Sequence, residues 1–401
     1  MTSNVSTYPT LDDVLRRDLQ TLERANLVRG THPVHARRDA TVRIDGRVAT
    51  DFSSNDYLGL AGDARIADAI AAALRSEGTG AAAARLISGT HDLHDQLECR
   101  IAAFKHTEAA LLFASGYAAN CGALPALAGR GDVIYADTLN HASLIDGCRL
   151  SRADIKVFPH LDVAALDRML RDDAGRYKRR WIVVDGVFSM DGDLFPLDAL
   201  VAVAKEHAAF TYVDDAHGTG LLGAAGRGSA EHWGVEGEID VSMGTLGKAI
   251  GTIGAFIAGS QALRSWLLNR ARAFVFTTAA PPALAAGTLE ALRIVDAEPW
   301  RRDRMRANAR ALRDGVRALD GREPAGTADG HIVPLIIGEA ADAARIGAAL
   351  RDRGLLVGAV RPPTVPLGTS RLRITASAAH TPEQIALLLE ALGELVPRRG
   401  T

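Results

Sequence analysis

The sequence predicts an α/β protein with a large, mainly parallel sheet and a smaller α+β lobe. Three observations carry this prediction: the chain has 401 residues, 47% of them are hydrophobic, and its central part alternates short apolar runs with helical stretches. A chain this long exceeds a single compact core, and strand–helix alternation is typical of a parallel sheet with helices on both faces. The predicted division is 1–50, 51–285 and 286–401.

The N-terminal segment, residues 1–50, is expected to hold a helix and a hairpin. Apolar residues recur at helical spacing between Leu11 and Leu27, and Pro33 closes this stretch. Asp45 and Gly46 then form a turn between two short runs, which is typical of a β-hairpin.

The large domain, residues 51–285, is predicted from seven apolar runs. They are AALLFA at 109–114, DVIYA at 132–136, IKVF at 155–158, RWIVVDG at 180–186, FTYVDDAH at 210–217, DVSMGTLG at 240–247 and AFIAG at 255–259. The small domain, residues 286–401, follows a long helical region that begins near Leu284. Its expected elements are strands at 331–338, 355–360 and 371–377 and helices from Ala341 and Thr381.

The charge balance excludes several classes of protein. A net charge of −2 gives no electrostatic footprint for nucleic acid, and the cluster Arg301, Arg302, Arg304 and Arg306 is interpreted as a solvated helix face. The longest weakly polar stretch, from Phe274, is interrupted by prolines and a glutamate, so no membrane span is expected. The N-terminus lacks a signal peptide and the three cysteines fit no disulfide or zinc spacing, which favours a cytoplasmic protein.

Lys248 stands out in the stretch GTLGKAIG, residues 244–251. Of the 46 basic residues only five are lysines, and this one lies among glycines and small side chains. Nucleophilic attack on a carbonyl carbon needs an amine that can lose its proton, which arginine cannot do near neutral pH. A Schiff base is therefore predicted at Lys248, with its pKa lowered by burial and cationic neighbours.

Other polar residues follow the predicted strands, where ligands bind in an open parallel sheet. SGYAAN places a helix start near Gly116 and Tyr117, whose free N–H groups suit a phosphate. His141 follows the next strand. Taken alone, an ordinary strand-to-helix turn and an isolated loop histidine are the simpler interpretations of these two features.

FTYVDDAH brings Asp214, Asp215 and His217 to the end of another strand. A carboxylate there suits a protonated ring nitrogen, although a helix cap beside a surface histidine explains the motif equally well. No further ligand cluster supports a metal ion. Thr245, three residues before Lys248, adds a hydroxyl, while the glycine spacing matches neither a P-loop nor a dinucleotide fingerprint. Phosphate cradle, carboxylate, histidine and lysine together predict pyridoxal 5′-phosphate (PLP) as the cofactor.

The ordered motifs resemble the α-oxoamine synthases, PLP-dependent transferases of the aspartate-aminotransferase fold (fold type I). The resemblance runs from about Leu11 to the C-terminus. It is carried by SSNDYLGL (53–60), RLISGTHDLHDQLE (85–98), LFASGYAAN (112–120), DTLNHASLIDG (137–147), DGVFSMDGD (185–193), VDDAHGTGLLGAAGRG (213–228), GTLGKAIG (244–251) and RPPTVPLGTSRLRIT (361–375).

The resemblance implies a role for each matching residue. Lys248 forms the Schiff base and moves the Cα proton, and Asp214 pairs with the pyridinium. His141 stacks on the ring, while His217 and Ser189 approach its phenolic oxygen. Gly116, Tyr117 and Thr245 hold the phosphate side, with Thr277 or Thr278 reaching it across a homodimer interface. The substrate residues implied are Arg361 for the amino-acid carboxylate, Arg29 and Thr364 for the acyl substrate, and Asn55 and His141 at the active site.

Within the family, the DDAHGTG motif and the Pro-Pro-Thr-Val-Pro run favour the member of biotin synthesis that condenses L-alanine with a pimeloyl thioester of coenzyme A or acyl carrier protein. Another member, such as one using glycine and acetyl-coenzyme A, stays open, as does a non-catalytic PLP-binding regulator. One departure concerns the loop after Gly80, where Ala81 to Ala84 replace the glycines and serine usual in the family. Alanine adopts positive φ angles poorly, so this loop is expected to differ.

Overall fold

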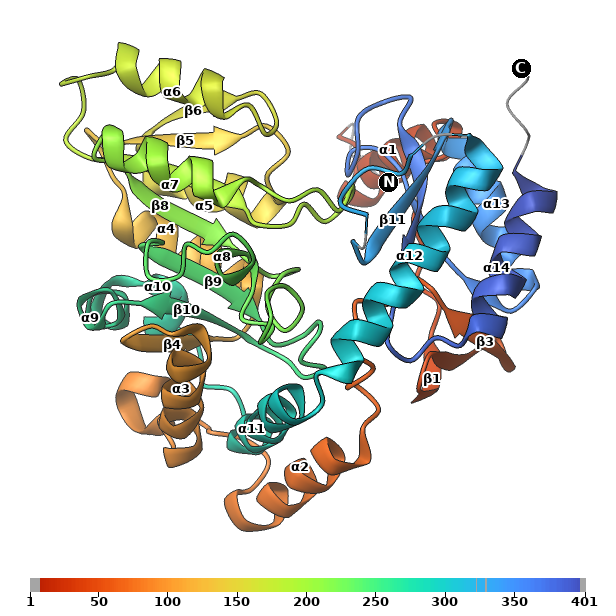
Figure 1. Cartoon of the computed structure of the whole chain (residues 1–401), viewed down its shortest axis with the longest axis horizontal. Coiled ribbons are helices and arrows are strands. Elements are labelled where there is room, and N and C mark those ends of the chain that lie inside the picture. The colour runs from red at the N-terminus through yellow and green to blue at the C-terminus, as the bar shows by residue number, and fades with distance from the viewer. Residues whose placement is uncertain (1–7, 322, 329, 397–401) are drawn as a thin grey trace, which may run out of the picture.

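The computed structural model describes residues 8–321, 323–328 and 330–396 (Figure 1). A seven-stranded sheet forms the large lobe, with the order β4-β10-β9-β8-β7-β5-β6. Only β10 runs antiparallel to its neighbours in this sheet, so the mainly parallel sheet predicted from the sequence is confirmed. Its strands are β4 (Ala109–Phe113), β5 (Val133–Asp137), β6 (Asp154–Phe158), β7 (Arg180–Asp185), β8 (Phe210–Asp214), β9 (Val241–Thr245) and β10 (Ala255–Gly259).

Helices cover both faces of the large sheet. Successive residues of β7 show why: Val183 packs in one apolar cluster with α4, α5 and α9, whereas Ile182 and Val184 pack in another with α6 and α7. A strand buried on both faces must be apolar throughout, as the sequence is. The helices of this lobe are α2 (Ala64–Glu77), α3 (Asp92–Lys105), α4 (Gly116–Leu127), α5 (Ala142–Ser151), α6 (Val163–Asp172), α7 (Leu197–Glu206), α8 (Ser229–His232), α9 (Gln261–Arg270), α10 (Arg272–Val275) and α11 (Pro282–Ala297), and a π-helical turn spans Arg85–Gly89.

The smaller lobe combines both ends of the chain, and Figure 1 shows the red N-terminal elements beside the blue C-terminal ones. Strand β12 of the C-terminal part pairs with β3 of the N-terminal part in the sheet β1-β2-β3-β12, while β11-β14-β13 form a second sheet. The predicted hairpin is confirmed, with Ile44 opposite Arg47. The elements are α1 (Leu11–Arg24), β1 (Val34–Arg38), β2 (Thr41–Ile44), β3 (Arg47–Asp51), α12 (Trp300–Asp320), β11 (Ile332–Gly338), α13 (Ala340–Asp352), β12 (Leu355–Leu356), β13 (Gly358–Val360), β14 (Ser370–Thr375) and α14 (Pro382–Leu395).

The interpretation of the α12 arginines as a solvated face was wrong. Arg302 is buried and donates to the carbonyls of Val295 and Ala224, and Arg306 donates to those of Leu221 and Gly223. Guanidinium groups supply five donors in a planar fork, so they can satisfy several loop carbonyls at once. These arginines therefore tie α12 to the large lobe, although Arg304 remains exposed.

The alanine run after Gly80 does contain a residue in the left-handed region. Ala82 has φ +56°, and the Ala83 carbonyl next to it accepts a hydrogen bond from the Ala279 N–H at 2.9 Å. A Cβ on Gly89 would lie 2.1 Å from that carbonyl oxygen, so the following π-helical turn requires glycine there. The backbone of this loop therefore requires Ala82 to adopt a strained, left-handed conformation.

Replacing Ala82 by glycine is expected to raise the free energy of unfolding by about 0.5–1 kcal/mol. Left-handed backbone costs alanine roughly 1–2 kcal/mol, which exceeds the entropy that glycine adds to the unfolded chain. The matched control is Ala81→Gly, where φ is not positive and a loss of about 0.5–1 kcal/mol is expected. Urea unfolding of both variants measures the difference; equal midpoints would contradict the assignment of strain to Ala82.

None of the helices in the described ranges is both long and apolar enough to cross a membrane.

Candidate active site

A cavity of about 190 Å³ lies at the carboxyl edge of the large sheet. Asp214 ends β8 and Thr245 ends β9, while Gly116 opens α4 just after β4, so three separate segments meet there. Seven residues predicted from the sequence line the cavity: Gly116, Tyr117, His141, Asp214, His217, Thr245 and Lys248. Ser143, Asp185, Ala216 and Met243 complete its wall.

Lys248 is half-buried at this cavity, and its Nζ lies 2.8 Å from Nε2 of His217. Burial lowers the pKa of Lys248 to about 8; the Asp214 carboxylate opposes this effect and the Arg373 guanidinium adds to it. The direction of this shift and its two causes, burial and a cationic neighbour, are those expected from the sequence. At neutral pH a useful fraction of the amine is uncharged, as a nucleophile requires.

The Asp214 carboxylate is buried and held from two sides. Asn120 donates to Oδ2 at 2.7 Å and the Ala216 N–H donates to Oδ1 at 3.0 Å, while Tyr212 donates to the Asn120 side-chain oxygen at 2.7 Å. Burial raises the pKa of Asp214, and Lys248 and Asn120 oppose that rise. A cationic group in the cavity would gain strongly from this desolvated carboxylate. Asn120 has no distinctive signal in the sequence, because it lies in the middle of an apolar helix.

His141 caps α5 and presents its ring at the cavity. The backbone N–H of His141 donates to the Asp185 carboxylate at 2.7 Å, and the ring Nδ1 lies 2.7 Å from the Ser143 hydroxyl. Asn120 also donates to that hydroxyl oxygen, at 2.9 Å. The Ser143 hydrogen is thus free to point at Nδ1, which fixes the ring orientation. Burial lowers the pKa of His141 and the Asp214 charge works against it, so the neutral ring is favoured.

The neighbouring Asp215 points away from the cavity into a buried ion pair. Lys105 lies 3.0 Å from its carboxylate, and the Ser229 hydroxyl and N–H donate to it at 2.7 and 3.1 Å. Two adjacent aspartates therefore have different tasks: one faces the ligand cavity and the other anchors the loop that carries His217.

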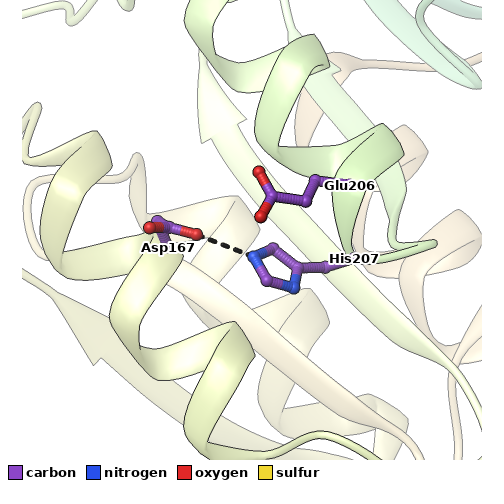
Figure 2. A group of neighbouring side chains, drawn as sticks. All are labelled: Asp167, Glu206 and His207. Carbon is purple, nitrogen blue, oxygen red and sulfur yellow. Dashed lines mark hydrogen bonds and ion pairs between the residues drawn. The ribbon is translucent and has the colours of Figure 1, made fainter.

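In the described part of the chain, one surface group has the spacing to hold a metal ion: Asp167, Glu206 and His207, between α6 and the end of α7 (Figure 2). His207 already lies 2.7 Å from Asp167, and Arg171 pairs with the same carboxylate at 2.6 Å. The group lies outside the lining of the Lys248 cavity.

Of the predicted substrate residues, His141 lines the cavity, whereas Arg29, Asn55, Arg361 and Thr364 do not. Arg361 donates to the carbonyls of Asn26 and Val28 at 2.6 and 3.3 Å, and Arg29 donates to the Pro362 carbonyl at 3.2 Å and the Thr364 hydroxyl at 3.5 Å. These contacts join the segment after α1 to the loop before β14. Ser189 and Thr364 line a separate cavity of about 330 Å³. Thr278, which follows Thr277 in the chain, forms an isolated antiparallel β-bridge with Ala84.

Arg373 was missed by the sequence analysis. It lies on β14, is 8% exposed, and donates to the Ser189 carbonyl at 2.6 Å, the Asn55 side-chain oxygen at 3.2 Å and the Tyr57 hydroxyl at 3.3 Å. Within the described ranges no carboxylate lies at ion-pair distance from it, in contrast to Arg371, which pairs with Asp191. The signal in the sequence was that Arg373 follows Arg371 by two positions in the strand SRLRIT, so both arginines lie on the same face of that strand.

His160 braces the loop that carries Ser189. Its two ring nitrogens lie 3.0 Å from Asp137 and 2.9 Å from Asp193. Burial alone would lower the pKa of His160, but the two carboxylates raise it to about 9. The doubly protonated ring therefore bridges the end of β5 and the loop.

This bridge predicts a pH-dependent contribution to stability. The folded-state pKa of about 9 exceeds the unfolded value of about 6.5, so the contribution is fully present below pH 6.5 and is lost as the pH rises to 9. His160→Gln is expected to cost up to roughly 3 kcal/mol at pH 6 and much less at pH 9.5. Paired urea unfolding across this range measures the difference; a constant gap between wild type and variant would contradict it.

Comparison with known proteins identifies the family and supports the fold. A sequence profile of the class I and II aminotransferases matches residues 47–392. A curated protein from Methylococcus capsulatus, named 8-amino-7-oxononanoate synthase, is 49% identical over 368 residues, 92% of this chain and 94% of that one.

Two solved structures extend the comparison. Serine palmitoyltransferase from S. paucimobilis, with a bound PLP–myriocin aldimine, aligns with a TM-score of 0.89 at 33% identity, over 97% of this chain and 98% of that one. The 8-amino-7-oxononanoate synthase of Francisella tularensis aligns with a TM-score of 0.75 at 28% identity, over 86% and 97% of the two chains. The chain therefore belongs to the class I and II aminotransferase family, as a PLP-dependent acyltransferase related to the 8-amino-7-oxononanoate synthases.

Proposed function

We propose that this enzyme condenses L-alanine with a pimeloyl thioester of coenzyme A or acyl carrier protein in biotin biosynthesis. The products are 8-amino-7-oxononanoate, CO₂ and the free carrier. The observation that carries the proposal is the Lys248 amine, with its lowered pKa, in one cavity with the buried Asp214 carboxylate. The names of the relatives support the choice of substrates.

The residues of the cavity fit PLP. The N–H groups of Gly116 and Tyr117 at the N-terminus of α4, which Ser115 caps, would hold the phosphate, and Thr245 would add a hydroxyl from the lining of the same cavity. Asp214 suits the protonated ring nitrogen, His141 a ring face, and Lys248 the aldehyde. When bound, PLP supplies an aldehyde that takes up amines and a protonated ring that withdraws electrons from Cα.

The chain's own residues supply positioning and proton transfer. Lys248 can bind as an amine, take a proton from the substrate Cα and return it, because its pKa lies near neutral pH. The Asp214 carboxylate would stabilise the positive charge of the protonated ring nitrogen, and this charge favours electron withdrawal from the substrate Cα. His217 contacts Lys248, and Asn55 accepts a hydrogen bond from Arg373. We expect the amino acid to bind on this side of Lys248.

Arg373 and Arg361 are both candidates for the amino-acid carboxylate. Arg373 is buried and lowers the pKa of Lys248, whereas Arg361 is half-buried and donates to the backbone carbonyls of Asn26 and Val28. Arg373→Lys is therefore expected to raise KM for alanine by about 10–100-fold, the size of one bidentate contact to a charged group. The matched control is Arg361→Lys, and steady-state kinetics with each substrate varied checks both; a larger KM effect at Arg361 would restore the family-based assignment.

A homodimer is part of the proposal. Helix α1 exposes an apolar stripe, with Leu11 74%, Leu15 49% and Leu19 51% exposed, and Phe276 beside Thr277 is 70% exposed. Such surfaces favour a protein partner. A second copy would also bring Thr277 or Thr278 toward a phosphate site, and sedimentation equilibrium tests the assembly.

Two alternatives stay distinguishable from the proposal. Another α-oxoamine synthase would use a different pair, such as glycine with acetyl-coenzyme A, and one methyl group is worth only about 1–3 kcal/mol in a pocket. A PLP-binding regulator would not turn over any pair. A panel of alanine, glycine and serine against pimeloyl-, acetyl- and palmitoyl-coenzyme A, ranked by kcat/KM with product masses, decides: the proposal requires alanine and pimeloyl-coenzyme A to rank first.

A further inference from the structure

A chain of short contacts runs from Lys248 away from the cavity through His217 to Tyr57. Nζ of Lys248 lies 2.8 Å from Nε2 of His217, and Nδ1 of His217 lies 2.7 Å from the Tyr57 hydroxyl. That hydroxyl also lies 3.0 Å from the Asn55 side-chain oxygen. Tyr57 is fully buried and His217 is 5% exposed, so these groups must satisfy one another.

Arg373 fixes the direction of the hydrogen bonds around Tyr57. A guanidinium only donates, and Arg373 donates both to the Asn55 side chain and to the Tyr57 hydroxyl. The Asn55 atom in this contact is thereby an acceptor. The hydroxyl hydrogen of Tyr57 then has two possible acceptors, the Asn55 side-chain oxygen and Nδ1 of His217.

The charged form of Lys248 decides between them. An ammonium group has donors only, so Nε2 of His217 must accept from it. Burial and the nearby cations lower the pKa of His217 far below its usual value, so the ring is neutral and carries one hydrogen, which must then sit on Nδ1. Nδ1 donates to Tyr57, and Tyr57 donates to Asn55. Every donor in the chain then has an acceptor.

We propose that Tyr57 and Asn55 are positioning residues that hold the His217 hydrogen on Nδ1, so that Nε2 faces Lys248 as an acceptor. The inference rests on the proposed role of Lys248 and adds the means by which its ammonium form is oriented. Charged and titratable groups also face this pair: Asp214, Asp185 and Arg373 act on Lys248, and Arg373, His331 and His141 act on His217. None of these groups is itself removed in Tyr57→Phe or Asn55→Ala, and Arg373 keeps its hydrogen bond to the Ser189 carbonyl in both variants.

The test is NMR on the full-length chain without cofactor, labelled with ¹⁵N in the histidine rings and ¹³C at lysine Cε. Twelve histidines and five lysines keep the spectra simple, and His217→Gln and Lys248→Ala assign the two signals. In the wild type at pH 6.5 the ring hydrogen is expected on Nδ1. In Asn55→Ala the Tyr57 hydrogen has only Nδ1 to receive it, so the ring hydrogen moves to Nε2.

Tyr57→Phe keeps the ring and removes the hydroxyl. The Nδ1 hydrogen then has no acceptor, so part of the ring population is expected to carry its hydrogen on Nε2 instead. Because Nε2–H cannot accept from an ammonium group, the uncharged fraction of the Lys248 amine is expected to rise in both variants by about tenfold, the size of one weakened charge-assisted hydrogen bond. A wild-type ring hydrogen on Nε2, or an unchanged lysine titration in both variants, would overturn the proposal. Asn55→Ala retains Tyr57, so a folding failure of Tyr57→Phe leaves the test intact. Because no substrate is present, failure of turnover with L-alanine rejects the proposed function and leaves this result standing.

Discussion

Lys248→Ala is expected to lower kcat by about 10⁴-fold or more, because on the proposed function the variant loses both the amine that would bind the cofactor and the group that would move the Cα proton. The matched variant Lys248→Arg keeps the positive charge but cannot lose its proton, so an equally large loss is expected. The control is Lys205→Ala, a surface lysine whose side chain is 62% exposed and paired with Glu238. Its kcat should stay within about twofold of the wild type.

Absorbance spectra of the same variants separate binding from chemistry. Wild type and Lys205→Ala should show the visible band of lysine-bound PLP, and both Lys248 variants should lose that band at equal cofactor concentration. Activity of Lys248→Arg within tenfold of the wild type would contradict the assignment of the amine as nucleophile and base.

Asp214→Asn is expected to lower kcat by about 10²–10³-fold, with a far smaller effect on the fold. The substitution preserves size but removes the buried charge opposite Lys248 that would keep a ring nitrogen protonated. Steady-state kinetics at saturating PLP measures the effect, since weaker cofactor binding is then compensated.

The neighbouring residue provides the matched control. Asp215→Asn breaks the buried ion pair with Lys105, whose side chains are 2% and 4% exposed, and should cost about 3–5 kcal/mol of unfolding free energy. The protein that remains folded should keep kcat within about tenfold. If Asp215→Asn abolished turnover in folded protein while Asp214→Asn did not, the roles assigned to the two aspartates would be reversed.

Most of the large sheet could be predicted because its strands are buried on both faces and therefore apolar throughout, as in the run from Trp181 to Val184. The run LLVGAV was predicted as one strand, yet it divides into β12 and β13, which join different sheets. Partner choice of this kind depends on tertiary contacts that no local pattern records. The α12 arginines were misinterpreted for the same reason, since their carbonyl partners lie 7–85 positions away.

The candidate site shows the same division. Lys248, Asp214 and His141 follow strands that end at one sheet edge, so their convergence was predictable from the sheet alone. Asn120, Tyr57 and Arg373 come from a helix, an N-terminal loop and the smaller lobe, and only the folded chain brings them together. Asn120 and Tyr57 contact the predicted residues Asp214 and His217, and Arg373 acts on Lys248, but their residue types alone do not indicate these contacts.

The most direct test of the account measures coenzyme A and CO₂ released by the purified protein from L-alanine and pimeloyl-coenzyme A. The account predicts equal molar release of both, dependent on PLP and absent in Lys248→Ala. Release of coenzyme A without CO₂, or equal release by Lys248→Ala, would contradict it.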